Sequence, residues 1–429
     1  MKQLTRESMQ ITAARWILHE EQSTYLEIPF TMPEHVEEIH VSYEVKSPGK
    51  QKAVIDLGIR DGSRVRGWSG GARTEFTLGL EKATPGYIPG QLHAGEWAVL
   101  HNAYKVPDEG CEVAITLQFC FASPRWLKGD LHTHSIHSDG TFTLEANASI
   151  MEVLGCDFIA MTDHNTSSQN FAYPRNTNVV MIPGMEFTTN FGHSNFLGSV
   201  DPLDDFRVSD QKDVEDRIRT ARQRGAKIVL NHPHCDHCPW EWDFQVEHDW
   251  VEVWNGPWKA RNARTLAWWQ HQLESGRRMV AVGGSDVHRE GEYVRHAVPC
   301  TWVLASAKTS DDILRGIAQG RVFITYSPEG PFVEFTCGCY QMGDMVPASE
   351  ADKRVFLRCA DLKPGDLVKL ISENGVEREV VITQLHNTPP DVIMNGSAKQ
   401  FVRAEIWRYF KEMNAMLPLV LTNPIYFEK

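Results

Sequence analysis

Histidines and carboxylates stand at the ends of short apolar segments of this chain, at spacings that could bind metal ions. The first cluster is GDLHTHSIHSDG, in which His132 and His134 are two residues apart. On a β-strand both rings would point to the same face, so the pair could hold one ion. Asp139 follows in the same cluster and offers a carboxylate from the loop beyond the strand.

Four further clusters end four other apolar segments. A carboxylate can bridge two cations, so Glu186 is expected at the middle of a multinuclear site. The candidate donors outnumber the ligands of a single tetrahedral zinc ion, which predicts two or three divalent ions. These donors are His164 in FIAMTDHN, Glu186 and His193 in IPGMEFTTNFGHSNFLG, His232 in AKIVLNHPHCD, and Asp286 and His288 in MVAVGGSDVHRE.

The elements that would position these donors alternate between strand and helix from Trp126 to about residue 325. Such alternation predicts parallel strands with crossover helices, and about seven repeats favour an α/β barrel, in which the strand ends converge on one face. The strands are expected at Leu127–His132, Phe158–Thr162, Val179–Pro183, His193–Leu197, Lys227–Asn231, Trp250–Trp254, Met279–Gly283 and Thr301–Leu304, and the helices at Leu144–Leu154, Gln211–Arg224, Lys259–Ser275 and Ser310–Gln319.

Both regions that flank the expected barrel are predicted to consist mainly of β-strands. Residues 1–124 contain short alternating runs separated by Gly, Pro and Asp, which predicts a β-sandwich-like domain. Residues 125–325 form the predicted barrel. Residues 326–429 are predicted to form a smaller β-rich domain with one helix-like stretch at Ala404–Met413.

Composition limits the partners. The chain has 429 residues with 56 acidic and 43 basic side chains, a formal net charge of -13, which disfavours a nucleic-acid groove and leaves small molecules and cations. We find neither a run of about 20 apolar residues nor a signal peptide, so no membrane association is expected. Nine cysteines, an odd number, favour a reduced cytoplasmic protein. The sequence does not indicate an oligomeric state.

The order HTHS…SDG, TDH, G-x-E, GH, NHPH and SDxH resembles the PHP (polymerase and histidinol phosphatase) family of metal-dependent phosphoesterases, over roughly residues 126–325. The resemblance implies a distorted (β/α)7 barrel that holds two or three Zn, Mn or Fe ions. The segments RGWSGGAR, ATPGYIPGQLHAGEW and EVWNGPW resemble the carbaryl-hydrolase-like branch of that family.

The resemblance also implies a distribution of ligands. Asp139 stands where many members of the family have histidine, and His137 is a neighbouring imidazole that could substitute for it. The implied sets are His132, His134, Glu186 and Asp286 for the first ion, Glu186, His193 and His232 for the second, and Asp139, His164 and His288 for the third.

The expected function is phosphoester hydrolysis of a small phosphorylated substrate by a metal-bridged hydroxide, with Glu186 and Asp286 holding the ions. Asp163 would orient His164. Arg289 would pair with a phosphate oxygen, and Asn255 would donate a hydrogen bond to the substrate.

Three alternatives stay open. The same centre could hydrolyse a carbamate, ester or amide, or the chain could be a non-catalytic metal-binding interaction module. In HPHCDHCPWEW, Cys235 and Cys238 have zinc-knuckle spacing with His234 and His237 between and beside them, so a separate zinc site competes with a loop that flanks the substrate.

Overall fold

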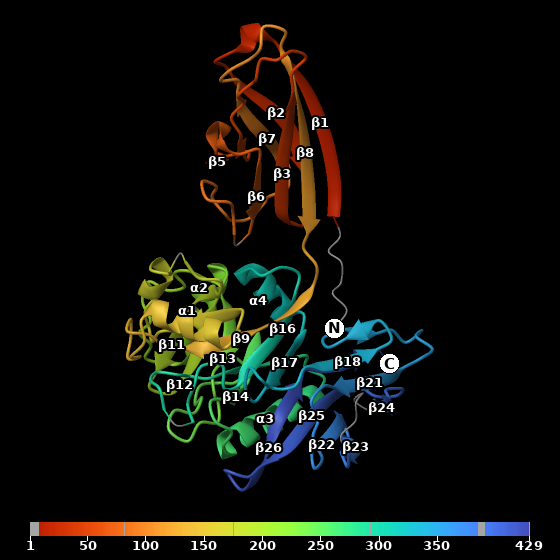
Figure 1. The fold of residues 1–429 in the computed structure, drawn as a ribbon. Coiled ribbons are helices and arrows are strands. Elements are labelled where there is room, and N and C mark those ends of the chain that lie inside the picture. The colour runs from red at the N-terminus through yellow and green to blue at the C-terminus, as the bar shows by residue number, and fades with distance from the viewer. Residues whose placement is uncertain (1–7, 81, 175, 292, 385–390, 429) are drawn as a thin grey trace. The chain divides into compact units, whose positions relative to one another are not determined.

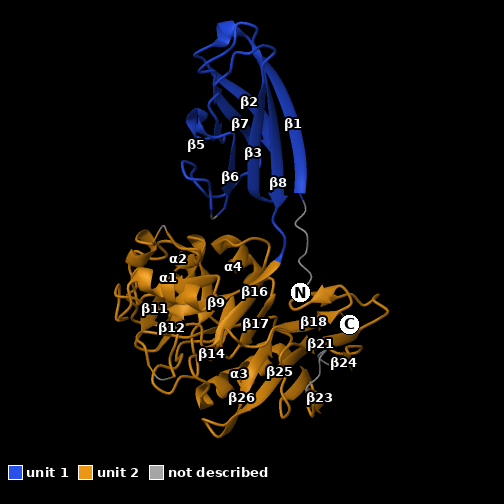
Figure 2. Cartoon of the chain, in the orientation of Figure 1, with its two compact units in different colours: residues 1–124 blue, residues 125–429 orange. Residues whose placement is uncertain are grey.

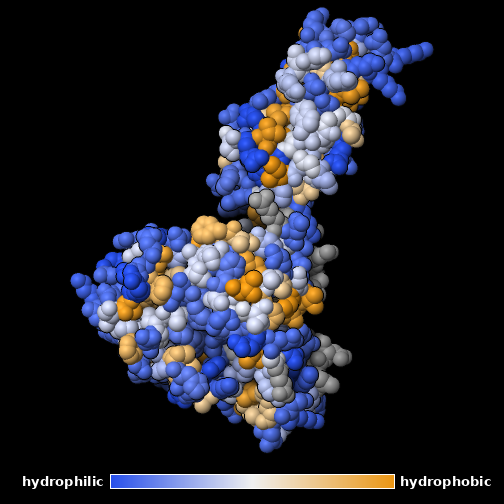
Figure 3. All heavy atoms as spheres, turned by 90° about the vertical axis from the view of Figure 1, so that its left-hand side faces the viewer, coloured by the Kyte–Doolittle hydropathy of each residue, from blue (hydrophilic) through white to orange (hydrophobic). Residues whose placement is uncertain are grey.

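The computed structural model describes residues 8–80, 82–174, 176–291, 293–384 and 391–428. The chain divides into two compact units, residues 1–124 and 125–429 (Figures 1 and 2). On the face drawn in Figure 3 hydrophilic residues predominate, and apolar ones occur in scattered groups.

The N-terminal unit consists of two four-stranded antiparallel sheets. Buried and less buried residues alternate along most of Cys111–Phe121, as expected for a strand with one face on a core. Ile39 and Phe119 of one sheet share a hydrophobic core with Trp97 and Val99 of the other. The sheets have the orders β1 (Ser8–Ile17), β8 (Cys111–Phe121), β3 (Val36–Lys46), β6 (Glu75–Gly79) and β2 (Tyr25–Met32), β7 (Gly95–Asn102), β4 (Gly58–Arg60), β5 (Val65–Trp68).

A long curved sheet organises the second unit. Its first seven strands follow one another in chain order; β9, β10 and β11 are parallel, as are β13, β14 and β15, while β12 is antiparallel to both of its neighbours. These strands are buried along most of their length, which explains their continuous apolar sequences. They are β9 (Arg125–Thr133), β10 (Phe158–Met161), β11 (Val180–Thr189), β12 (Gly192–Leu197), β13 (Lys227–Leu230), β14 (Trp250–Asn255) and β15 (Val280–Gly284).

Four α-helices occur among the described residues: α1 (Leu144–Val153), α2 (Gln211–Gln223), α3 (Ala260–Glu274) and α4 (Ser310–Ala318). Thr143, Asp210 and Thr309 cap three of them by accepting a backbone N–H bond. The sevenfold strand–helix repeat of the expected (β/α)7 barrel is therefore not evident. One reason is that β11 and β12 form a hairpin, so no crossover helix is needed between them. None of these helices is long and apolar enough to cross a membrane.

Hydrogen bonds connect the first strand of this series with the last. Beyond β15, the Asp286 N–H donates to the His132 carbonyl at 2.8 Å, and the His134 N–H donates to the Val287 carbonyl at 3.1 Å. The carboxylate of the fully buried Asp130 accepts the N–H of Ser285 at 2.9 Å and that of Ala297 at 2.7 Å. Burial raises the pKa of Asp130 to about 6, although these hydrogen bonds act in the opposite direction. The C-terminal ends of β9 and β15 are thus held side by side.

The sheet continues beyond β9 through antiparallel strands: β16 (Cys300–Ala305), β17 (Val322–Thr325), β26 (Ala415–Thr422), β25 (Phe401–Phe410), β22 (Leu367–Ser372) and β23 (Gly375–Val381). A smaller sheet has the order β19 (Tyr340–Gln341), β18 (Val333–Cys337), β21 (Arg354–Cys359), β24 (Val392–Asn395), and β20 (Met345–Val346) pairs with β27 (Ile425–Phe427). The helix predicted at Ala404–Met413 is wrong, because β25 pairs with strands on both sides.

Asn423 links β15 to β17 at a buried position. Its Oδ1 accepts the Ala281 N–H at 2.9 Å, and its Nδ2 donates to the carbonyls of Ala281 and Val322 at 2.8 and 3.1 Å. The side chain therefore stands in for a strand between β15 and β17.

We predict that Asn423→Ala destabilises the protein by about 3 kcal/mol, because the buried N–H and carbonyl of Ala281 lose their side-chain partner, whereas the Val322 carbonyl keeps the backbone N–H of residue 423. Urea unfolding measures the loss. Asn395→Ala is the control, since Asn395 is exposed and its side chain accepts one N–H, that of Ser397. Equal stability of the two variants would contradict the assigned role.

Candidate metal centre

The first ligand group lies where β9 meets the end of β15. The side chains of His132, His134, Glu186 and Asp286 place one donor atom each within 4.8 Å of one another. His132 Nε2 is 3.3 Å from Glu186 Oε1 and 3.4 Å from Asp286 Oδ1, and His134 Nε2 is 3.2 Å from Asp286 Oδ1. The two histidines project from one face of the β9 segment, as their spacing predicts.

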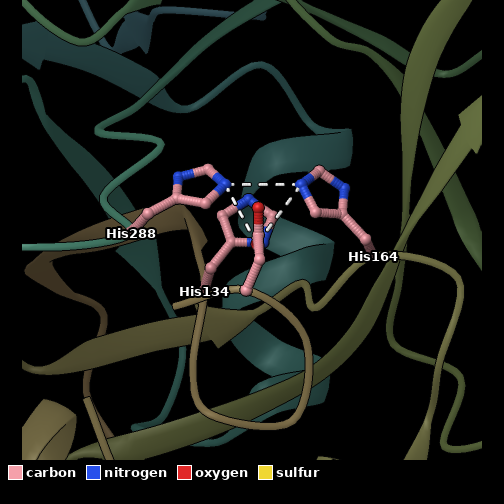
Figure 4. A group of neighbouring side chains, drawn as sticks. His134, His164 and His288 are labelled. Carbon is pink, nitrogen blue, oxygen red and sulfur yellow. Dashed lines mark hydrogen bonds and ion pairs between the residues drawn. The ribbon is translucent and has the colours of Figure 1, made fainter. Parts of the chain in front are cut away.

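A second group stands beside the first and shares His134 with it. His134, Asp139, His164 and His288 bring their donor atoms within 4.8 Å of one another. Figure 4 shows the rings of His164 and His288 pointing toward each other on either side of His134; their Nε2 atoms are 3.3 Å apart. Asp139 Oδ1 is 3.3 Å from His288 Nε2 and 3.6 Å from His164 Nε2. Asp139 thus occupies a donor position itself. His137 lies elsewhere, with Nδ1 2.8 Å from Ser168 Oγ.

The third group consists of His193, His232 and Cys238. Glu186 Oε1 adjoins it, 3.2 Å from His193 Nδ1 and 3.6 Å from His232 Nε2. The structure therefore brings all nine predicted donors together around Glu186 and adds a thiol that the sequence analysis did not assign to this centre.

Glu186 is fully buried and lies against five imidazoles. Burial raises its pKa, but the positive charge of His132 and the hydrogen bonds of the neighbouring histidines outweigh burial and hold the pKa well below its usual range. Burial raises the pKa of Asp286, but the charge of His132 and the hydrogen bond and charge of His134 together outweigh burial and lower the pKa. Both carboxylates are thus anionic at neutral pH and fit cations.

Buried polar atoms that lack a hydrogen-bond partner indicate whether the centre fits metal ions. Among the described residues, the buried His132 Nε2 and Glu186 Oε2 have no hydrogen-bond partner, although atoms of other candidate metal ligands lie within 3.4 Å of each. Burying such atoms unpaired is costly. Convergent imidazole nitrogens and carboxylate oxygens at these separations are a donor set that Zn, Mn or Fe would satisfy.

Glu252, in the middle of β14, is a functional residue that the sequence analysis missed. Its side chain is buried, and Oε1 lies 2.9 Å from His132 Nδ1. Its Oε2 accepts the His232 backbone N–H at 3.0 Å and Asn255 Nδ2 at 3.1 Å. A carboxylate behind a histidine ligand fixes the ring and its tautomer. The available signal was a single charged residue within the apolar strand WVEVWN.

Asp163 was predicted to orient the His164 ring, but its carboxylate has other partners. Its carboxylate accepts the Ser135 N–H and hydroxyl, both at 2.8 Å, and the Ser138 hydroxyl at 2.7 Å. His164 Nδ1 instead faces Thr188 Oγ1 at 2.6 Å. Asp163 therefore holds the loop that carries Asp139.

The other predicted substrate contacts differ in environment. Arg289 is exposed and directly follows His288. Asn255 is buried, with Nδ2 3.3 Å from Asp286 Oδ2, and its Oδ1 accepts the Arg261 guanidinium at 2.8 Å. Asn255 is thus occupied in positioning Asp286.

Cys235 belongs to none of the candidate metal groups found in the described part of the chain, so a separate zinc knuckle is not seen there.

Comparison with known proteins gives structural likenesses alone: no protein-family model and no curated protein matches the chain. A two-domain protein from Bacteroides vulgatus that contains a predicted PHP-like metal-dependent phosphoesterase is 17% identical, with 71% of this chain and 95% of that one covered and a TM-score of 0.42. An amidohydrolase from Chromobacterium violaceum is 17% identical, with 38% and 89% covered and a TM-score of 0.29. A predicted metal-dependent phosphoesterase from Bifidobacterium adolescentis is 15% identical, with 44% and 94% covered and a TM-score of 0.27. None of the three is described as a carbaryl hydrolase.

We predict that Glu252→Gln weakens metal binding by about 10- to 100-fold, because the His132 ring loses its anionic partner while the side-chain shape is kept. Competitive titration with a chromophoric chelator measures the affinity. Glu274→Gln is the matched control, on the last turn of α3 away from these groups. Unchanged affinity in Glu252→Gln would refute the role of Glu252.

Proposed function

We propose that this chain is a metal-dependent hydrolase, and that its reaction is phosphoester hydrolysis of a small phosphorylated molecule. The observation that carries the proposal is the meeting of three donor groups at the buried Glu186. Two or three divalent ions of Zn, Mn or Fe would be held by His132, His134, Asp139, His164, Glu186, His193, His232, Asp286 and His288.

The residues have separate tasks in this reaction. Bound divalent ions supply Lewis acidity, which activates water and neutralises charge that builds on the ester oxygens. Glu186 and Asp286 bridge the donor groups and fix their spacing. Glu252 keeps the His132 ring oriented, and Asp163 keeps the Asp139 loop in place. Arg289 binds a phosphoryl oxygen of the substrate from the exposed side of the centre.

A second candidate is hydrolysis of a carbamate, ester or amide at the same centre. The resemblance of RGWSGGAR and EVWNGPW to the carbaryl-hydrolase-like branch supports it. A neutral carbamate needs no cationic side chain, so dependence on Arg289 separates the two reactions. A purely non-catalytic metal-binding module is disfavoured by the complete donor set. We also propose that the N-terminal unit is a β-sandwich, that residues 125–325 and 326–429 are separate domains, and that the protein works in the cytoplasm.

His132→Ala and Asp286→Ala are each expected to abolish turnover, because each removes a donor from the most buried ligand group. Metal analysis of the purified wild type should give at least about two equivalents per chain, as bridging carboxylates hold ions in pairs. His271→Ala is the control, since His271 is exposed on α3 and contacts Glu274. Full activity in either ligand variant would refute the assignment of the centre.

Arg289→Ala is expected to raise KM for phosphate esters by about 10-fold, the loss of roughly one charge-assisted hydrogen bond, and to leave aryl carbamate hydrolysis unchanged. Steady-state kinetics on a panel of phosphomonoesters, phosphodiesters and aryl carbamates measures both. Arg219→Ala, on exposed α2, controls for the loss of one positive charge. An unchanged KM for every phosphate ester would remove Arg289 from the site, and turnover of carbamates alone would select the second candidate.

A further inference from the structure

We propose that the thiolate of Cys238 is a metal ligand, and that with Glu186, His193 and His232 it completes a four-donor site for one ion. The inference rests on the proposed metal centre, but it is independent of the reaction that the centre catalyses. It assigns to Cys238 a role different from the zinc knuckle that its sequence spacing indicates.

The geometry places the sulfur among the other donors. A donor atom of His193, one of His232 and Cys238 Sγ all lie within 4.8 Å of one another. Cys238 Sγ is 3.9 Å from His232 Nδ1, whereas Glu186 Oε1 is 3.2 Å from His193 Nδ1 and 3.6 Å from the other ring nitrogen of His232, Nε2. Ligand atoms of a tetrahedral ion are separated by roughly 3.3–3.8 Å when bond lengths are about 2.0–2.3 Å. A small contraction around an ion would therefore bring His193, His232 and Cys238 to bonding distance, and Glu186 Oε1, which lies next to both histidines, would offer the fourth donor.

The loop that carries Cys238 is fixed beside His193 by packing. The Cys235 N–H donates to the His232 carbonyl at 2.8 Å and the Trp240 N–H donates to the Pro233 carbonyl at 2.9 Å, so the chain folds back immediately after β13. Gly192 lies against Trp240 so closely that a Cβ on it would be 2.7 Å from the Trp240 Cα. The β11–β12 hairpin and the cysteine loop thus pack directly on each other, with Cys238 half-buried between two potential ligands.

Cys235 has a different environment, although its thiol hydrogen-bonds with that of Cys238. Its sulfur lies 4.0 Å from Arg261 Nη1, and among the described residues it joins none of the candidate metal groups. The two cysteines of the CxxC pair are therefore distinguishable: one faces the metal centre, and the other packs beside α3. Cys235 serves as an internal control.

A thiolate donor has two chemical consequences. Binding replaces the S–H bond by a sulfur–metal bond, so one proton leaves the thiol for solvent with each ion bound at this position. Sulfur is a soft ligand that favours Zn, Fe or Co over Mg or Mn. The position with Cys238 is expected to select a softer ion than the position formed by His134, Asp139, His164 and His288, which is built from nitrogen and oxygen alone.

Cobalt substitution of the full-length protein tests the proposal without any substrate. Co²⁺ added to metal-free protein should produce a sulfur-to-cobalt charge-transfer band in the near ultraviolet. Cys238→Ser should lose that band, while Cys235→Ser and Cys339→Ser, which removes an exposed thiol, should keep it. A band that persists in Cys238→Ser, or is absent from the wild type with cobalt bound, would overturn the assignment. If the wild type shows no band and Cys238→Ser only binds cobalt more weakly, Cys238 is a hydrogen-bond partner behind His232. That result would also overturn the assignment of Cys238 as a ligand.

Alkylation of the wild type gives a second measurement that needs no variant. Iodoacetamide should modify Cys238 in metal-free protein and modify it far less with zinc bound, as mass spectrometry of the peptide shows. The exposed Cys339 should react equally in both. Equal modification of Cys238 with and without zinc would overturn the proposal, whereas loss of phosphoesterase activity alone would bear on the reaction and not on this ligand.

Discussion

The structure of the metal centre depends on one interaction, the anionic carboxylate of Glu186 buried among histidines. Both of its oxygens lie within 3.4 Å of imidazole nitrogens, from His132 and His193 on one side and from His134 and His164 on the other. A carboxylate in such a place is stable only with positive charge around it. The strands that end near Glu186 are arranged so that this charge can be supplied.

The backbone around the centre departs from regular geometry where the ligands stand. His232 has a φ of 29° and Asp286 a φ of 55°, in the left-handed region that costs a non-glycine residue energy. Both residues follow directly or closely on a strand, and both have backbone N–H groups held by the surroundings: that of His232 by Glu252, and that of Asp286 by the His132 carbonyl. The strained conformations are thus held by two hydrogen bonds, one to the Glu252 side chain and one to the backbone of the ligand His132.

Much of this arrangement could be predicted from the sequence, because histidines and carboxylates that end apolar strands are a local signal. Phe158–Met161 and Trp250–Asn255 lie within one residue of the predicted strands. Residues whose role depends on distant contacts were missed. Glu252 sits inside a strand that is buried on both faces, so alternation does not reveal its direction. Cys238 reaches the centre only because its loop folds back.

The errors have the same origin. The segment 404–413 has residues compatible with either helix or strand, and pairing of β25 with β22 and β26 decides for strand. The sevenfold strand–helix repeat was expected from apolar runs, but β11 and β12 form a hairpin, so the chain reverses direction between them without a helix. Pairing partners are not encoded locally, and neither outcome could be read from the segment alone.

Exposure differs sharply across the donor groups: the Asp139 side chain is 59% exposed, whereas that of Glu186 is 1% exposed. An ion held through Asp139, His164 and His288 would exchange with solvent faster than an ion enclosed by His132 and Asp286, since departure requires no opening of the core. Chelation would then empty the centre in a fixed order, the outer ion first. The protein would pass through a partly loaded form, whose lifetime depends on how firmly the buried Glu186 holds the remaining ion. A shortage of metal in the cell would first lower the occupancy of the outer position.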